Sequence, residues 1–325
     1  MYYLPEQIDI LMATYNGEKY IDGQIQSLLS QTHQNFCLYI CDDHSKDTTK
    51  EIIEKYAKDY PEKIKIIVSE KNLGAIQNFS FLLNHSMNHS KADYVMFADQ
   101  DDIWMKDKIE KSLAKMKHLE KVHGKDLPLL VHTDLTVVDQ NLNILGQSFW
   151  KYTHLKPFSF HTTNRFLVQN VVTGCTMMLN RQLCQLSLPV PNEALMHDWW
   201  IALTAATFGK IGIVNEPTIL YRQHGSNTLG AKKFKLFKTL KDGLIAYWNK
   251  DRTLQKKMDA RQAQAKAFFE RFQSQLNKKE HLMFKDYLEF QHRPFFKKRM
   301  TMIKHRFFRS EFVINCALFV MGAKP

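Results

Sequence analysis

The sequence lacks both of the glycine-rich loops that commonly hold the phosphates of a nucleotide. Neither a G-x-x-x-x-G-K-[ST] segment nor a G-x-G-x-x-G segment occurs in the 325 residues. Such loops present backbone N–H groups and a helix N-terminus to the phosphates. Their absence excludes the P-loop and dinucleotide-binding classes. A nucleotide bound here would need a metal ion on carboxylates to hold its phosphates.

Cysteine is scarce as well, and long apolar runs are missing. The five cysteines form no C-x-x-C pair, so we expect reduced, buried thiols in a reducing compartment. No window of about 18 uninterrupted apolar residues occurs, so we expect no membrane-spanning helix. The first residues have no basic region followed by an apolar stretch, so we also expect no secretory signal.

The net charge of +12 is unevenly distributed along the chain. Residues 231–325 contain 23 Lys or Arg and 8 Asp or Glu, whereas residues 1–230 contain 22 basic and 25 acidic side chains. A near-neutral body with a basic tail favours a polyanionic partner, which is either an anionic lipid surface or a nucleic acid.

Short apolar runs alternate with helical patterns through the first 120 residues. The runs at residues 8–13, 36–41, 64–68 and 94–98 predict buried strands. Apolar residues at helical spacing predict helices at 20–30, around 47–56 and at 76–85. This alternation predicts an α/β fold with a mixed, mostly parallel sheet covered by helices. Further strands are expected at 129–133, 135–138, 171–179, 211–214 and 218–221, and a helix at 193–208.

Three carboxylates follow the fourth strand within four residues, at Asp99, Asp101 and Asp102. They repel one another and are costly to desolvate together, so they suit a hard cation such as Mg²⁺ or Mn²⁺. The alternative is an acidic turn in which Asp102 caps a helix that begins near Ile103. Polar turns also end the first two strands. Because the carboxyl ends of parallel strands meet at one edge of a sheet, this convergence favours the metal site.

Six segments, in this order, resemble glycosyltransferase family 2: ILMATYNGEKYI, CDDHSKDTT, EKNLGAIQNF, FADQDDIW, HDWW and YRQHGSNTLG. The likeness spans about residues 6–230. It is strongest to bacterial rhamnosyltransferases of cell-wall or capsular rhamnose polysaccharide synthesis, through HDWW and YRQH. The resemblance implies a GT-A fold and an inverting transfer from a nucleotide-diphosphate sugar, dTDP or UDP. A Q-x-x-R-W segment is absent, which favours the addition of one or a few sugars.

The resemblance also implies a role for individual residues. Asp198 matches the base position, and His197 departs from the Glu that many members have before it. Asp101 is the expected ligand of Mn²⁺ or Mg²⁺, with Asp99 near the ribose or the metal. The chemistry of its imidazole makes His224 a further expected metal ligand or a donor to the diphosphate. The expected acceptor contacts are Gly174, Trp199 and Trp200, with one tryptophan in the core because adjacent helix positions point about 100° apart. The expected donor contacts are Thr14, Tyr15, Asn16, Asp42, Asp43, Asn72, Gly74, Asn78, Asp99, Gln100 and Arg222.

Several of these positions have a plainer interpretation. Asp198 can be a solvated carboxylate at a helix end, and His224 a solvated side chain in a turn. Turn chemistry alone explains Asn72 and Gly74, and a strand bulge explains Gly174.

The basic tail, residues 231–325, interleaves Lys and Arg with large apolar side chains at 232–238, 293–299 and 305–309. This composition is typical of helices that lie on an anionic membrane, although residues 262–276 also suit an ordinary packed helix. We therefore expect a catalytic domain at 1–230 and a membrane-associating helical region at 231–325. The protein would lie peripherally on the cytoplasmic face of the membrane and use a lipid-linked saccharide acceptor.

The expected function is thus transfer of L-rhamnose from dTDP-rhamnose. The first alternative is a UDP-hexose or UDP-aminosugar transferase of the same fold. The second is a non-enzymatic, basic nucleic-acid-binding protein, which is disfavoured because no helix-turn-helix, zinc or RNA-reading pattern occurs.

Overall fold

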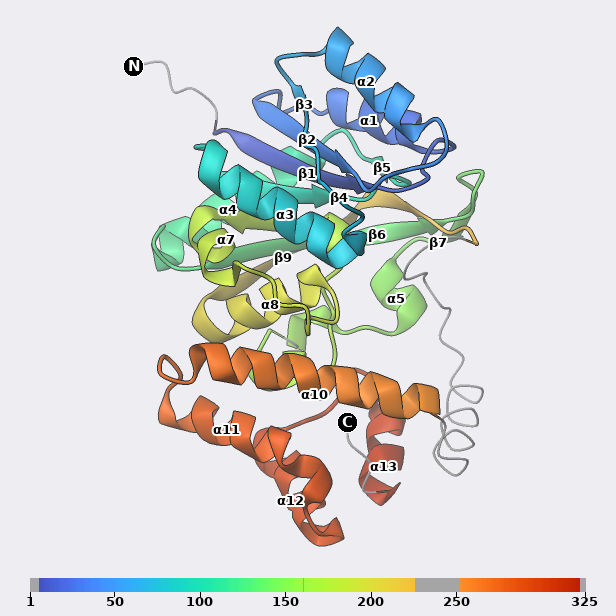
Figure 1. Cartoon of the computed structure of the whole chain (residues 1–325). Coiled ribbons are helices and arrows are strands. Elements are labelled where there is room, and N and C mark those ends of the chain that lie inside the picture. The colour runs from blue at the N-terminus through green and yellow to red at the C-terminus, as the bar shows by residue number, and fades with distance from the viewer. Residues whose placement is uncertain (1–5, 160, 226–251, 322–325) are drawn as a thin grey trace.

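The computed structural model describes residues 6–159, 161–225 and 252–321. A mixed sheet with strand order β3-β2-β1-β4-β8-β6-β9-β5 lies between helices, and β7 pairs with β6 at its side (Figure 1). The strands are β1 (Ile8–Thr14), β2 (Phe36–Asp42), β3 (Ile64–Ile66), β4 (Tyr94–Ala98), β5 (Ile103–Trp104), β6 (Leu129–Val138), β7 (Ile144–Gly146), β8 (Met178–Asn180) and β9 (Lys210–Arg222).

The first half of the sheet is parallel and the second half is mixed. Strands β3, β2, β1 and β4 run in the same direction. Strand β8 is antiparallel to both β4 and β6, β6 is parallel to β9, and β5 is antiparallel to β9. The parallel half brings the carboxyl ends of β1, β2 and β4 to one edge, and the candidate site lies there.

Alternation along the strands divides the core into two layers. In β4, Met96 and Ala98 point to one face and Val95 and Phe97 to the other, because successive strand residues face opposite sides. One face packs against α1 (Ile21–Leu29), α2 (Thr49–Asp59) and α4 (Lys108–His123). The other packs against α3 (Gly74–His89), α7 (Arg181–Ser187) and α8 (His197–Phe208). Two short helices, α5 (Phe149–Thr153) and α6 (Thr163–Phe166), precede α7.

The C-terminal helices form a further layer outside α8 (Figure 1). They are α10 (Arg252–Phe272), α11 (Lys278–Leu288), α12 (Phe295–His305) and α13 (Phe312–Met321). Phe268 and Phe272 of α10 pack against Trp200 of α8, with ring centroids 5.3 and 6.2 Å apart. The Tyr287 hydroxyl of α11 donates to the Leu167 carbonyl at 2.6 Å. These helices therefore share one hydrophobic core with the sheet.

The secondary structure differs from the sequence-based prediction at four places. The two strands expected within 129–138 form one strand, β6, and the two within 211–221 form β9. Residues 171–179 are mostly loop and a short 3₁₀ helix at Gly174–Thr176, with strand only at the end. No helix begins near Ile103, because Ile103 and Trp104 pair with β9 and α4 begins at Lys108. Asp102 is therefore not a helix N-cap.

The cysteines Cys37, Cys41, Cys175 and Cys184 are buried free thiols, and Cys316 is an exposed one. Within the described ranges, no helix is both long and apolar enough to cross a bilayer. The basic run at 232–238, the domain boundary expected at residue 230 and the end of the YRQHGSNTLG segment lie outside the described residues.

Candidate active site

The ends of β1 and β2 are joined side by side at the carboxyl edge of the sheet. Thr14 lies opposite Asp42 in the parallel register, and its hydroxyl donates to Asp42 Oδ1 at 2.9 Å. The other carboxylate oxygen of Asp42 accepts the Ser45 backbone N–H at 2.8 Å. Three hydroxyl and amide donors thus hold Asp42 in one orientation, because the Ser45 hydroxyl also donates to it.

Asp43 is used differently from its neighbour. Its two carboxylate oxygens accept the backbone N–H groups of Leu73 and Gly74, at 2.6 and 2.8 Å, where α3 begins. A carboxylate at a helix N-terminus is favoured by the unpaired N–H groups and the helix dipole. Asn72 donates to the Asp43 carbonyl and the buried Asn78 to the Cys41 carbonyl. Asp43, Asn72 and Gly74 therefore join β2 to α3.

Gln100 ties the acidic loop to the turn after β1. Its side-chain amide accepts from the Tyr15 N–H at 2.8 Å and donates to the Tyr15 carbonyl at 3.0 Å. The Tyr15 side chain remains 47% exposed at the rim. Gly17 lies directly against this amide, and any Cβ there would overlap the Gln100 side chain. Asn16, with φ of 49°, accepts from the Lys46 N–H at 2.9 Å.

Asp101 and His224 form a close pair at the rim. Asp101 Oδ2 lies 2.7 Å from His224 Nε2, and both side chains are largely buried, at 15% and 10% exposure. The His224 ring also packs on Tyr20, with centroids 4.8 Å apart. A carboxylate oxygen and an imidazole nitrogen held side by side suit a divalent cation such as Mn²⁺. These two residues therefore fit the expected metal role.

Arg222 braces the same loop from β9. Its Nε donates to the Asp101 carbonyl at 2.8 Å, its Nη1 donates to the Gln140 carbonyl at 2.7 Å, and its backbone N–H donates to Asp102 Oδ1 at 3.1 Å. The guanidinium also lies over the Tyr20 ring, 4.7 Å from its centroid. Backbone carbonyls therefore occupy much of its donor capacity, and the structure gives Arg222 a positioning role for the acidic loop.

A second group of carboxylates lies deeper. Ligand atoms of Asp99, Asp102 and Cys175 lie within 4.8 Å of one another. Burial and the neighbouring Asp101 raise the pKa of Asp99 to about 7, and burial raises that of Asp102 well above its usual range. The fully buried Lys108 ammonium has no hydrogen-bond partner among the described residues. Burial lowers the pKa of Lys108 to about 7, while Cys175 and Asp102 oppose that shift.

Asp198 lies in the first turn of α8, held by two donors. Its Oδ1 accepts from the Asn170 amide at 3.1 Å and its Oδ2 from the Gly174 N–H at 2.9 Å. Burial raises the pKa of Asp198 to about 7, opposed by the Gly174 hydrogen bond, and the Asp99 carboxylate raises it further. Cys175, which follows the donor Gly174, lies with the carboxylates of Asp99 and Asp102, so Asp198 is close to the acidic loop. A carboxylate with a pKa near 7 is suited to general base catalysis.

The residues around Asp198 fill the inner side of the site. His197 is buried against Phe79 and Phe97, and neither of its ring nitrogens has a hydrogen-bond partner among the described residues. Burial lowers its pKa to about 3, so this imidazole is neutral. Trp200 is fully buried in the core, as expected for one of the two tryptophans, so it offers no surface to an acceptor. Trp199 is partly exposed, with its indole donating to the Phe166 carbonyl.

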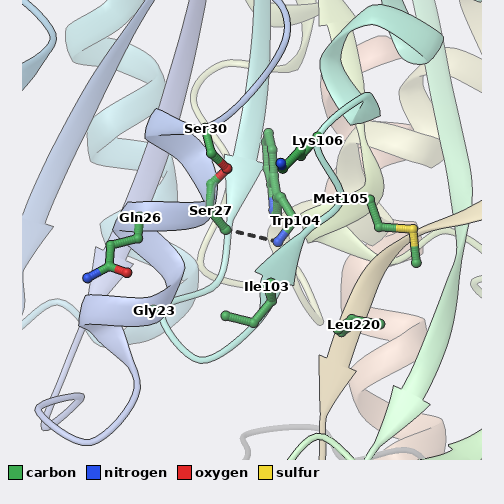
Figure 2. Close-up of a pocket in the computed structure, with 9 residues that line it drawn as sticks. All are labelled: Gly23, Gln26, Ser27, Ser30, Ile103, Trp104, Met105, Lys106 and Leu220. Carbon is green, nitrogen blue, oxygen red and sulfur yellow. Dashed lines mark hydrogen bonds between the residues drawn. The ribbon is translucent and has the colours of Figure 1, made fainter.

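A shallow apolar groove lies between α1 and β5, and none of the carboxylates described above lines it. Figure 2 shows it between α1 and β5, where the backbone N–H of Trp104 donates to Ser27 Oγ at 3.0 Å. Its volume is about 700 Å³. None of the lining residues described is acidic, so this groove has no ligands for a metal or a diphosphate. They are Gly23, Gln26, Ser27, Ser30, Ile103, Trp104, Met105, Lys106 and Leu220.

Sequence reasoning missed three residues of the site. Asn170 orients Asp198, and Cys175 and Lys108 lie with the buried carboxylates. Lys108 lies six residues after Asp102, so its place in the sequence could have indicated a cation near the carboxylates. Asn170 and Cys175 carried no signal, because their roles depend on contacts with distant segments.

Comparison with known proteins identifies the family. The model of Glycosyl transferase family 2 matches residues 9–184. The chain belongs to this family. The "dTDP-rhamnosyl transferase RfbG" of Shigella flexneri is 29% identical to it over 68% of this chain and 74% of the relative. The "UDP-Glc:alpha-D-GlcNAc-diphosphoundecaprenol beta-1,3-glucosyltransferase WfgD" of Escherichia coli is 25% identical over 71% of this chain and 82% of the relative.

Solved structures agree on the fold. The family 2 chain superposes on S. aureus TarS 1–349 in complex with UDP-GlcNAc with a TM-score of 0.54 and 18% identity, covering 92% of this chain and 85% of TarS. The expected GT-A fold is confirmed. The protein is thus a glycosyltransferase of family 2 with a GT-A fold.

Proposed function

We propose that this family 2 enzyme transfers L-rhamnose from dTDP-rhamnose to a lipid-linked saccharide, with inversion and with the help of a divalent metal ion. The rhamnosyl donor is supported by the 29% identity to RfbG. The lipid-linked acceptor is supported by WfgD, whose name specifies a diphosphoundecaprenol-linked sugar. The reaction would add one or a few sugars to a growing bacterial surface polysaccharide.

One arrangement carries the proposal. Asp99 and Asp102 lie with Cys175, whose neighbour Gly174 donates to Asp198, and Asp101 of the same acidic loop pairs with His224. The pair offers a carboxylate oxygen and an imidazole nitrogen 2.7 Å apart, a combination that suits Mn²⁺ or Mg²⁺. Asp99, on the same loop, is the third candidate ligand. A divalent ion bound there supplies positive charge to the diphosphate of the donor.

Asp198 would act as the base. Its carboxylate accepts the proton of the acceptor hydroxyl while the acceptor oxygen bonds to the anomeric carbon and the carbon–phosphate oxygen bond breaks, with the electron pair leaving on the diphosphate. Asn170 and Gly174 hold the carboxylate through one hydrogen bond to each oxygen. Each oxygen keeps a lone pair for the incoming proton. Attack from the face opposite the leaving group inverts the anomeric centre.

The donor nucleoside would lie over the ends of β1 and β2. The exposed ring of Tyr15 offers a surface for the base, and Asp42 offers a carboxylate for an imide N–H of thymine or uracil. Gln100 fixes the backbone of Tyr15 through two hydrogen bonds. Trp199, on the helix of Asp198, would contact the acceptor sugar.

The alternative within the same fold is a UDP-hexose or UDP-aminosugar donor. It is favoured by the UDP-sugar named for WfgD and by the UDP-GlcNAc bound in the TarS structure. Thermal unfolding with dTDP, UDP and GDP in the presence of Mn²⁺ separates the two. A ligand present at 100 times its Kd adds about 2.7 kcal/mol of stability, so the true donor nucleotide gives the largest Tm increase.

The C-terminal region, residues 231–325, is proposed to hold the enzyme on the cytoplasmic face of the membrane, where a lipid-linked acceptor is available. Its excess of Lys and Arg favours an anionic surface. The decisive test of the function is turnover of a panel of nucleotide-sugars by the purified full chain. Product formation from dTDP-rhamnose that survives Asp101→Asn or Asp198→Asn would refute the assignment of the site.

A further inference from the structure

Helix α12 exposes apolar side chains to solvent although its other face is already buried in the protein. Phe296, Met300 and Ile303 are 79%, 66% and 54% exposed. They follow the i, i+4, i+7 spacing that places residues on one face of a helix. On the opposite face, Met302 and His305 are buried against the protein. This exposed stripe is therefore not needed for the packing of α12.

Basic side chains border the stripe on both sides. At 100° per residue, Arg299 lies on one flank, and Lys297 and Lys304 lie on the other. Residues 293–310 contain seven Lys or Arg and no Asp or Glu. We call the three apolar residues together with Lys297 and Arg299 the α12 face; Lys298 lies on the opposite side of the helix, and the Lys304 ammonium is paired with Asp286.

The α12 face is held rigidly by ionic contacts beneath it. Asp286 of α11 is only 5% exposed and accepts from Arg293 at 2.5 Å, from Lys304 at 2.9 Å and from His305 at 2.6 Å. These contacts fix both ends of α12 to α11. The apolar stripe is thus presented in one orientation rather than on a loose segment.

The neighbouring helix extends the same kind of surface. Helix α13 has no charged residue, its first residue Phe312 is 75% exposed, and none of its described side chains is buried. The Arg299 guanidinium lies 3.1 Å from the centroid of the Phe295 ring and 5.5 Å from that of Phe319 in α13. The two helices therefore meet around a cation that contacts aromatic rings of both.

We propose that the α12 face binds an anionic phospholipid bilayer, with Phe296, Met300 and Ile303 entering the boundary between head groups and acyl chains. An apolar stripe with Lys and Arg on its flanks is typical of helices that lie in this interface. The long basic side chains reach the phosphates while their stems cover apolar surface. The inference deepens the proposed function, because it assigns membrane attachment to particular side chains.

The structure also limits which of the basic segments takes part. In the run at 305–309, Phe307 is fully buried, and Arg309 pairs with Glu311 at 3.5 Å. That run is used largely for folding. Helix α12, which contains most of the run at 293–299, supplies the membrane contact.

Co-sedimentation of the purified full chain with vesicles tests the proposal. Vesicles of phosphatidylglycerol and phosphatidylethanolamine are compared with vesicles of phosphatidylcholine alone. We expect at least tenfold stronger binding to the anionic vesicles, falling as salt is raised. The triple variant F296S/M300S/I303S should lose most of this binding. The variant K297Q should weaken it by roughly fivefold, since each basic group near the surface contributes about 1 kcal/mol.

Matched controls come from exposed positions elsewhere. I144S/L145S/F158S removes three apolar side chains that are 56%, 48% and 63% exposed, and K50Q/K266Q removes two lysines that are 69% and 68% exposed. Both controls should bind vesicles as the unaltered chain does. Equal vesicle binding by F296S/M300S/I303S and the unaltered chain overturns the proposal. So does a chain that binds neither kind of vesicle, which would point to a protein partner instead.

Two further measurements distinguish a failure of the membrane proposal from a failure of the proposed reaction. Thermal unfolding of each variant should match that of the unaltered chain, because the altered side chains are exposed. Release of nucleoside diphosphate from the donor sugar in the absence of vesicles should also be unchanged. Vesicle binding needs no sugar or nucleotide, so it can succeed where the donor assignment fails, and the reverse also holds.

Discussion

The backbone N–H of Gly174 donates a 2.9 Å hydrogen bond to Asp198 Oδ2, which joins the loop before β8 to the first turn of α8. The close approach depends on the missing side chain. A Cβ at position 174 would lie 2.9 Å from His197 Nε2 and 3.5 Å from the Asp198 Cβ. The glycine therefore allows the loop to approach α8 closely enough to orient the carboxylate.

Gly174→Ala should impair catalysis more than stability. The added methyl group must push away His197 and, with it, the carboxylate of Asp198, and overpacking of this kind typically costs 1–3 kcal/mol. We expect kcat to fall by at least tenfold, measured as release of nucleoside diphosphate. Gly225→Ala is the control, since no atom of the described residues lies within 4 Å of a Cβ there. Equal kcat values for the two variants would contradict the proposed role of Gly174.

Asp198→Asn should lower kcat by roughly 10² to 10⁴ with little change in donor affinity, because a general base contributes in this range. Burial raises the pKa of Asp198 to about 7, and only the ionised carboxylate accepts a proton. Activity of the unaltered enzyme should therefore rise with pH through about 7. A pH profile that is flat between pH 5.5 and 8 would argue against this base.

Asp101→Asn and His224→Ala should each weaken Mn²⁺ binding by roughly a hundredfold, since changes even beyond the ligands themselves reach that size. Titration of the full chain with Mn²⁺, followed by calorimetry, measures this directly and without any substrate. Asp59→Asn, at an exposed position, is the control. If both site variants bind Mn²⁺ as tightly as the unaltered chain, Asp101 and His224 are not metal ligands.

Gln100→Ala should weaken donor binding while leaving the metal ligands intact. Two hydrogen bonds that fix the Tyr15 backbone are lost, each contributing about 1 kcal/mol, so the Kd for the donor nucleotide should rise by roughly tenfold. Equilibrium binding of the nucleotide to the variant and to the unaltered chain measures this change in Kd. Gln26→Ala, which alters an exposed glutamine on α1, serves for comparison and should leave the affinity unchanged.

Asp286→Asn should destabilise the fold by about 3 kcal/mol, as expected when a buried charge loses its partners. Burial opposes ionisation of this carboxyl, but the hydrogen bonds from His305, Lys304 and Arg293 outweigh it and lower its pKa to about 2. The stabilisation is therefore complete above about pH 4, the pKa of an unfolded Asp, and is lost as the pH falls toward 2. Urea unfolding measures the change. Glu289→Gln, which removes an exposed partner of Arg293, should cost less than about 1 kcal/mol.

The parallel half of the fold could be predicted from the sequence because its information is local. The apolar runs that form β1, β2 and β4 end at polar turns, and helical spacing marks the segments between them. The segment at 171–179 is just as apolar, yet most of it forms a buried loop and a 3₁₀ turn against α8. The apolar residues of this segment indicate that it is buried, but they do not indicate that it forms a strand. The antiparallel pairings of β5 and β8 depend on contacts with distant strands.

The site shows the same limit at the level of single residues. Asp101, Asp198 and His224 stand out because their side chains carry chemistry and follow strand ends or open a helix. Arg222 also stood out as an expected donor contact, and in the structure its side chain donates to the Asp101 and Gln140 carbonyls while its backbone N–H donates to Asp102. Pattern alone cannot tell a guanidinium that is held by carbonyls from one that is available to a phosphate.

Phe268 and Phe272 pack on Trp200, which is two residues from the proposed base Asp198. This packing limits how the protein can be truncated. A protein truncated before α10 would expose the apolar outer face of α8 to solvent. It would then aggregate, and its activity and membrane binding could not be measured. Exchanging the last helices between related enzymes carries the same risk unless the facing surface of α8 is exchanged with them. The proposed membrane contact is therefore best studied by single amino-acid changes, because the C-terminal helices and the helix of Asp198 share one hydrophobic core.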